Sequence, residues 1–80
     1  MNVIQTPASK VINGYGLEPP EPFELMMEAL AHLRPGETVL LLLPREPFPL
    51  YQALDAAGFS HQTRRAPDGG FEILSSRSLE

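Results

Sequence analysis

Apolar residues along the chain fall into short segments with two different spacings. The β-branched pair within residues 10–12 predicts a first strand, which a glycine-containing turn follows. Residues 37–43 contain a continuous apolar run, 39–43, which is too short for a typical helix and does not alternate. Such a run predicts an inner strand that is covered on both faces or deeply placed. Residues 59–65 and 70–75 predict two last strands, joined as a hairpin by the turn sequence APDGG.

Two segments between these strands show helical spacing. Residues 21–33 precede the stop signal Arg34-Pro35-Gly36, and residues 47–57 precede Gly58, a natural helix-terminating residue. In the first helix we expect the inward face to contain Phe23, Met26, Met27, Leu30 and Leu33. In the second we expect an inward stripe of Phe48, Tyr51, Leu54 and Ala57, with Leu50 and Ala53 alongside.

The order of these elements, β-α-β-α-β-β, determines the expected fold class. Strand-helix-strand succession predicts a parallel pair joined by a right-handed crossover, and the final hairpin adds antiparallel strands. The expected product is an α+β two-layer sandwich, in which a mixed four-stranded sheet carries two helices on one face. A ferredoxin-like arrangement would need a helix between the last two strands, and APDGG is too short to form one.

The length of 80 residues predicts a single domain. We expect this domain to span residues 9–76, after a disordered segment at residues 1–8. Residues 77–80 are expected to be a tail that is partly a remnant of protein expression, because the chain ends in Leu79-Glu80. No signal-peptide pattern begins the chain, and the apolar run 39–43 is far too short to span a bilayer. A cytoplasmic location is therefore the default expectation.

Composition excludes several classes of function. A net charge of −4 with only 6 basic residues argues against binding to nucleic acids or anionic membranes, although Arg64 and Arg65 are adjacent. The chain has no cysteine, which excludes disulfides, thiol catalysis and thiolate metal sites. His32 and His61 lack the spacing of a metal site, and no catalytic constellation is visible. We therefore predict neither catalytic nor metal-binding residues, and no cofactor.

Two proline-rich stretches, GLEPPEP at residues 16–22 and PREPFPLY at residues 44–51, each precede a predicted helix. If the first two strands are parallel, both stretches lie at the same edge of the sheet, where α/β proteins often bind ligands. The candidate binding residues there are Glu18, Pro19, Pro20, Arg45, Glu46 and Tyr51.

A purely structural interpretation of the two stretches is equally open. Proline presets the backbone of the first helical turn, and glutamates near a helix start complement its dipole. In that case Arg45 pairs only with Glu46 or Glu18, and the edge binds nothing.

The first stretch resembles the signature of the TusA-like (SirA-like) sulfur-carrier superfamily, a glycine-leucine-x-cysteine-proline-x-proline sequence at the first helix. Gly16, Leu17, Pro20 and Pro22 match this signature, and Pro19 stands in place of the cysteine. Together with REPFPLYQALDAAGF, the chain is similar to a cysteine-less branch of the superfamily, the domain-of-unknown-function family DUF 2249. The resemblance covers residues 10–73 and implies the β-α-β-α-β-β two-layer fold.

The resemblance also limits the activity that can be carried over. Sulfur carriers transfer sulfur as a persulfide on the cysteine, and Pro19 cannot carry one, so we expect no sulfurtransferase activity and no enzyme. We expect a non-catalytic interaction or regulatory module whose partner is another, unidentified protein and which is a monomer or weak homodimer. Members of the branch also occur joined to hemerythrin-like or other redox-related domains. The alternative they imply is an accessory protein in sulfur or redox-cofactor metabolism that binds a small ligand at the helix N-terminal edge. A third hypothesis is a ligand-binding domain that pairs with another copy of itself.

Overall fold

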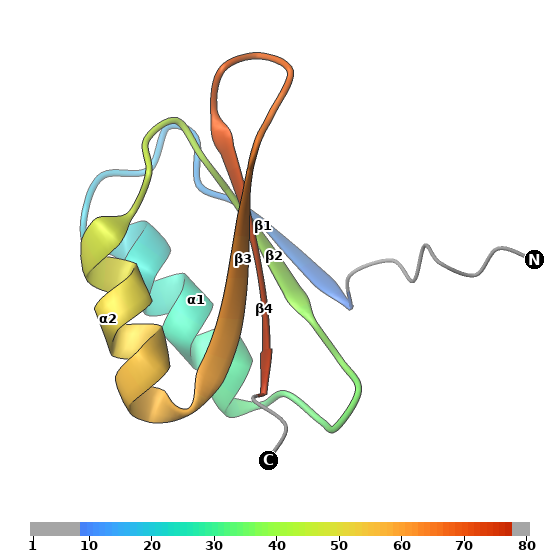
Figure 1. Ribbon diagram of the computed structural model, residues 1–80. Coiled ribbons are helices and arrows are strands. Elements are labelled where there is room, and N and C mark those ends of the chain that lie inside the picture. The colour runs from blue at the N-terminus through green and yellow to red at the C-terminus, as the bar shows by residue number, and fades with distance from the viewer. Residues whose placement is uncertain (1–8, 78–80) are drawn as a thin grey trace, which may run out of the picture.

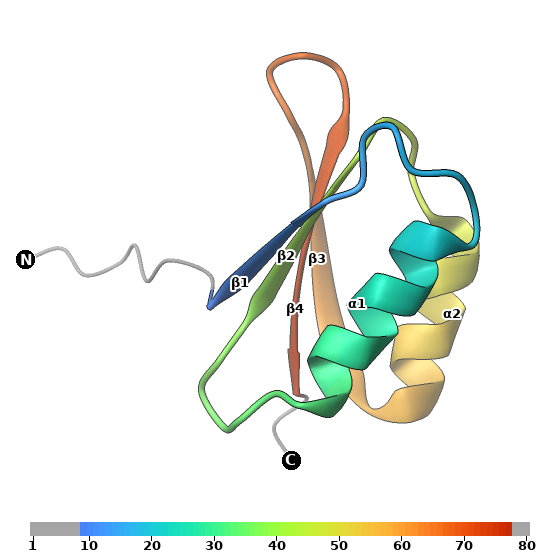
Figure 2. The same cartoon turned by 180° about the vertical axis from the view of Figure 1, so that it is seen from behind.

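Residues 9–77, which the computed structural model describes, form two layers (Figure 1). The predicted disordered segment 1–8 and residues 78–80 of the predicted tail lie outside the described residues. The elements are β1 (Lys10–Asn13), α1 (Glu21–Ala31), β2 (Val39–Leu43), α2 (Phe48–Ala57), β3 (Phe59–Arg65) and β4 (Phe71–Arg77). Both helices lie on one face of the sheet, as the two opposite views show (Figures 1 and 2).

The four strands are arranged in the order β1-β2-β4-β3. β1 and β2 are parallel, with Ile12 opposite Leu41, whereas β4 pairs antiparallel with both β2 and β3. β3 and β4 form a hairpin whose turn lies at APDGG, as predicted. Ala66 N donates to Gly70 O across this turn over 2.8 Å. The predicted fold class, a mixed four-stranded sheet with two helices on one face, is confirmed.

β2 is an inner strand, but only one of its faces is covered. Val39, Leu41 and Leu43 are buried beneath the helices, and the alternate residues Leu40 and Leu42 are half-buried on the opposite face. The expectation of cover on both faces is therefore wrong, whereas the deep placement is correct. The apolar run suggested cover on both faces because leucine also occupies the positions that face away from the helices. Neighbouring residues on β1 and β4 partly shield these leucines.

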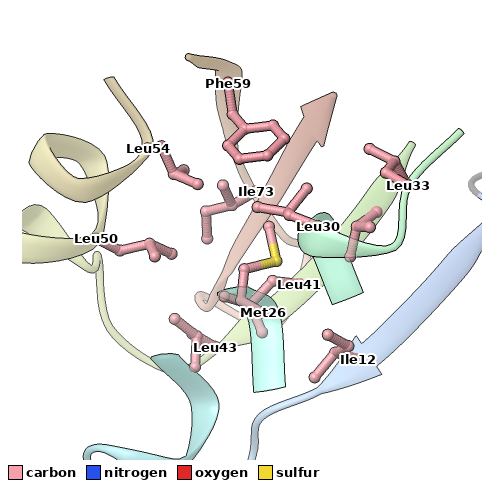
Figure 3. Packing of buried hydrophobic residues seen from close by; sticks show 11 residues of the cluster. Ile12, Met26, Leu30, Leu33, Leu41, Leu43, Leu50, Leu54, Phe59 and Ile73 are labelled. Atoms are coloured by element: carbon pink, nitrogen blue, oxygen red, sulfur yellow. The ribbon is translucent and has the colours of Figure 1, made fainter. Parts of the chain in front are cut away.

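α1 contributes the centre of the core. Met26 and Leu30 are fully buried and pack against Leu41 and Ile73 of the sheet (Figure 3). The helix ends at Ala31, two residues earlier than predicted, and Leu33 is buried just beyond it. Phe23, predicted to face the core, is 37% exposed. Neither helix has a side-chain cap at its N-terminus, and both have a proline in the first turn.

α2 packs on the sheet with a face that matches the predicted stripe only in part, since Leu54 is buried as predicted and Tyr51 packs against the core. Leu50 and Leu54 are its buried residues, one helical turn apart, while Phe48 is 63% exposed. Phe48 precedes Leu50 by two residues, a separation that places the two side chains on opposite sides of a helix. The prediction that Phe48 and Ala57 face inward is therefore wrong. Gly58 ends the helix in the left-handed conformation (φ 85°), as its type predicts.

Candidate binding groove at the proline-rich loops

The loops that carry the two proline-rich stretches lie side by side at one end of the sheet. Both views show the chain leaving β1 and the chain leaving β2 at the same end, and both helices beginning there (Figures 1 and 2). The parallel pairing of β1 with β2 causes this arrangement, because parallel strands end at the same edge. The predicted meeting of the two stretches is thus present in the structure.

Gly14 allows the two loops to approach closely. Its backbone N donates to the carbonyl of Leu42 over 2.7 Å. A Cβ atom at this position would lie 2.6 Å from Leu43 Cδ2 and 2.8 Å from the Leu42 carbonyl oxygen, and 3.5 Å from Pro22. Only glycine fits there without displacing the second strand, so this residue fixes the distance between the two loops.

Between the loops lies a groove of about 600 Å³, which we call the proline groove. Six prolines line it: Pro19, Pro20, Pro22, Pro44, Pro47 and Pro49. Gly14, Leu17, Phe23, Leu43 and Leu50 add to its lining. Its charged residues are Glu18, Arg45 and Glu46. A volume of this size is within the range of sites that hold small ligands or a partner's side chain.

The first turns of both helices border the groove but offer few backbone donors to an anion. In α1, Glu21 N donates to Glu18 O over 2.9 Å and Glu24 N to Pro20 O over 3.0 Å. In α2, Leu50 N donates to Pro47 O over 3.0 Å. Pro22 and Pro49 have no N–H to donate. The groove is therefore better suited to apolar contact than to binding phosphate.

Arg45 is the cation of the groove. Its side chain is exposed, and among residues 9–77 it forms no ion pair. The pairing with Glu46 or Glu18 that the structural interpretation included is absent from residues 9–77. Glu46 instead accepts a hydrogen bond from the Tyr51 hydroxyl over 3.0 Å, which holds its carboxylate towards α2. The guanidinium of Arg45 is thus available to a carboxylate that comes from outside the described residues.

Tyr51 is the one predicted site residue that does not line the groove. Its ring stacks on His61 of β3 with a centroid distance of 4.7 Å, and its hydroxyl also bonds the hydroxyl of Thr63. Burial raises the pKa of Tyr51 above its ordinary value, and the Glu46 carboxylate raises the pKa further, while the bond to Thr63 opposes this shift. Tyr51 therefore anchors the second loop through Glu46.

Tyr15 plays a similar part for the first loop. Its hydroxyl donates to both carboxylate oxygens of Asp68 in the β3–β4 turn, each over 3.3 Å. Desolvation and the negative charge of Asp68 raise the pKa of Tyr15. The ring also lies against Gly70, where an added Cβ would meet the Tyr15 hydroxyl at 1.7 Å. Each proline-rich loop is thus tied by one tyrosine to the β3–β4 side of the molecule.

Sequence reasoning missed some residues of the groove. Five of the six predicted site residues line it, namely Glu18, Pro19, Pro20, Arg45 and Glu46. Phe23 was assigned to the core because its spacing from Met26 and Leu30 is helical, whereas the structure places it at the groove. Pro44, Pro47 and Pro49 belong to the second proline-rich stretch, and the repetition of proline in both stretches indicated a shared surface. Nothing in the sequence pattern identified Leu17 or Gly14 as a binding residue.

The described residues show no cluster that could hold a metal ion, since no three His, Cys, Asp or Glu side chains come together within 9–77. His61 Nε2 lies 3.1 Å from Asp55 Oδ1, and the two form a surface pair between β3 and α2. No helix in the described part of the chain is long and apolar enough to cross a membrane.

Comparison with known proteins identifies the family. The model of the family described as an uncharacterized conserved protein, DUF2249, matches residues 12–77. The chain belongs to the DUF2249 family. This confirms the family that the motif resemblance indicated. Among curated proteins, none matches the chain.

A solved structure has the same fold as this DUF2249 domain. The crystal structure of a SirA-like protein from Desulfitobacterium hafniense superposes with a TM-score of 0.77. The similarity covers 88% of this chain and 99% of that chain, with 19% sequence identity. At this identity the likeness shows a shared fold, which is the SirA-like fold that the motif resemblance implied.

Proposed function

We propose that this DUF2249 domain is a non-catalytic interaction module that docks another protein in the proline groove. The observation that carries the proposal is the meeting of two proline-rich loops around an apolar groove beside Arg45, which forms no ion pair within residues 9–77. The partner is expected to present an apolar side chain next to a carboxylate. The side chain would contact the prolines and Phe23, and the carboxylate would accept hydrogen bonds from Arg45.

The absence of cysteine supports a non-catalytic role. The motif resemblance places a sulfur-carrying cysteine at the position of Pro19, which lines the groove. A proline has no group that can hold sulfur, and the chain has no other cysteine to replace it. The rigid backbone around this position remains, so the surface that presents the cysteine in a carrier is free to serve as a docking surface here.

Rigidity favours docking for a physical reason. Proline has a fixed φ, so a surface built from prolines loses little conformational entropy when a partner covers it. The hydrogen bonds of Tyr15 and Tyr51 and the Gly14–Leu42 hydrogen bond hold the loops in place. Binding energy is then not spent on ordering the loops.

Affinity capture from a lysate of the source organism, read by mass spectrometry, tests the proposal. Arg45→Glu reverses the charge in the groove, and Arg34→Glu makes the same change at an exposed residue outside its lining. We expect one protein to be captured by the wild type and by Arg34→Glu, and to be lost with Arg45→Glu. Equal capture by all three forms would overturn the proposal, and so would capture by none of them.

A small ligand in the same groove is a second candidate function, which the volume of about 600 Å³ favours. This version corresponds to an accessory role in sulfur or redox-cofactor metabolism. Native mass spectrometry of the protein, freshly purified from its source organism, would detect such a ligand as a mass increment. The increment should disappear with Arg45→Glu and persist with Arg34→Glu. A protein that carries no increment in any preparation counts against this candidate.

A further inference from the structure

The second feature of the molecule that suggests binding is the outer edge of β1. The strand order places β1 at one edge of the sheet, where it pairs with β2 alone among the described strands. Lys10 N donates to Thr38 O over 3.2 Å, and Gly14 N donates to Leu42 O over 2.7 Å. Because backbone groups alternate in direction along a strand, the N–H and C=O groups of Val11 and Asn13 point away from β2. Within residues 9–77, no other strand pairs with this row of donors and acceptors.

A second groove runs along this edge, between β1 and α1. Its volume is about 690 Å³, and we call it the edge groove. From β1, Val11 and Ile12 line it; from α1, Leu25 and Ala29 do so. Val11 is 56% exposed and Leu25 is 38% exposed, so apolar surface lies directly beside the open backbone groups. Figure 2 shows α1 alongside β1 at this side of the sheet.

We propose that β1 accepts an extended segment of a basic partner protein as an added strand. The backbone of the segment would bond the outward groups of Val11 and Asn13, which gives affinity without regard to sequence. Every second side chain of the segment would enter the edge groove and contact Leu25 and Ala29. This surface is distinct from the proline groove, since the two share no lining residue.

The charges of the edge groove favour a basic occupant. Glu28 and Glu37 line it together with one lysine, Lys10, and one histidine, His32. Within residues 9–77 neither glutamate forms an ion pair. The whole chain carries a net charge of −4, so its long-range field also attracts a basic segment.

A second copy of the chain fits this edge less well than a peptide segment. A stable dimer buries about 800 Å² on each partner. That area is about a seventh of the 5513 Å² surface of this small domain, more than an edge of 4 residues can supply. Pairing two copies through β1 would also bring Glu28 and Glu37 of both copies to one seam, where like charges repel.

The opposite edge of the sheet provides a contrast. β3 is longer, with 7 residues, but exposes Gln62, Arg64 and Arg65. Charged side chains on an edge strand oppose the addition of another strand. β1 has one charged residue, Lys10, at its first position, and an exposed valine in its middle. The two edges therefore differ in the chemistry that decides strand addition.

Binding of designed peptides, followed in ¹H–¹⁵N spectra of the full chain, tests the proposal. The probe is a blocked peptide of about eight residues that alternates valine and lysine, roughly 26 Å long when extended. We expect shifts of the amide signals of Val11, Asn13, Leu25 and Ala29. A peptide of the same sequence with alternate backbone nitrogens methylated should bind at least about tenfold more weakly, because it loses the strand hydrogen bonds. A valine–glutamate peptide should also bind more weakly.

Two variants of the protein separate strand addition from general attraction between charges. Val11→Pro removes the outward N–H, which the pairing with β2 does not use, whereas Val11→Thr keeps it. We expect the first to weaken binding about tenfold and the second to change it less than about twofold. Equal binding of the methylated and unmethylated peptides would overturn the proposal, and so would shifts confined to the proline groove. A dimeric mass in sedimentation that Val11→Pro abolishes would assign the edge to a second copy instead.

Discussion

The two proline-rich loops perform the same structural task with different side chains. Each begins a helix that has no side-chain cap, and each places a proline at the second helical position, Pro22 in α1 and Pro49 in α2. Their charges differ. The α1 loop leads into the acidic residues Glu21 and Glu24. The first turn of α2 has no acidic residue and follows Arg45, which has no ion-pair partner in the described part of the chain.

This difference indicates how architecture and binding are divided between the loops. The prolines are common to both loops because both helices need a rigid start, and their clustering produces the groove as a consequence. The cation occurs in one loop alone, where neither Glu18 nor Glu46 neutralises it. Substitutions in the prolines and glycines should therefore change stability, and substitution of Arg45 should change binding.

The largest expected effect is at the contact between the loops. Gly14→Ala would place a Cβ 2.6 Å from Leu43 Cδ2 and 2.8 Å from the Leu42 carbonyl oxygen. We expect it to lower the free energy of unfolding by about 2–3 kcal/mol, as overpacking does. Gly16→Ala meets nothing within 4 Å and strains only the backbone at φ 83°, which should cost about 1 kcal/mol. Urea denaturation measures both, and an equal loss in the two variants would contradict the close approach of the loops.

The two equivalent prolines provide the next comparison. Pro22 is buried and Pro49 is exposed, although both occupy the second position of their helices. Pro22→Ala should cost about 1.5–2.5 kcal/mol, because it loses buried CH₂ groups as well as the restriction of the unfolded chain. Pro49→Ala should cost only about 0.5–1 kcal/mol. Thermal unfolding of the two variants measures these costs. A larger loss of stability in Pro49→Ala than in Pro22→Ala would contradict the prediction.

The tyrosine anchors give the smallest effects. The folded pKa of Tyr51 is raised above its ordinary value of 10.0, so the folded state holds this proton more tightly than the unfolded state. The resulting stability is fully present below about pH 10 and is lost as the pH rises through the folded pKa. Between about pH 8 and pH 11, the wild type should lose more stability than Tyr51→Phe, which has no proton to release. Urea denaturation at the two pH values measures the stability of each protein. An equal loss of stability in the wild type and in Tyr51→Phe would show that Tyr51 does not contribute this pH dependence.

The sequence predicted the fold because its signals were local. Gly58, APDGG and the prolines stop or start elements through backbone preferences that the rest of the chain does not alter. Which side chains face the core was harder to predict where both sides of a helix or strand are apolar. Phe48 and Leu50 compete for the core face of α2, and nothing local decides that Leu50 is buried. On β2, the leucines at positions 40 and 42 likewise led to the wrong prediction that both faces of the strand are covered.

The candidate site was predicted in part for related reasons. Parallel pairing of β1 and β2 is enough to bring the two proline-rich loops together, and the sequence predicted that pairing. The partners of single side chains depend on tertiary distances that spacing does not contain. The structural interpretation paired Arg45 with Glu46 or Glu18, whereas the Glu46 carboxylate accepts a hydrogen bond from Tyr51. Phe23 lies at the groove and is 37% exposed, although its spacing from Met26 is helical.

Site-specific photocrosslinking tests the central claim, that the proline groove is where a partner docks, most directly. Benzoylphenylalanine would replace Phe23, which lines the groove, or Phe48, which is more exposed but does not line it. Both forms would be irradiated in the lysate and the crosslinked products identified by mass spectrometry. Our account predicts one crosslinked protein from position 23, lost when Arg45→Glu is added, and none of it from position 48. Crosslinking of the same protein from position 48 alone, or equally from both positions, would contradict the account.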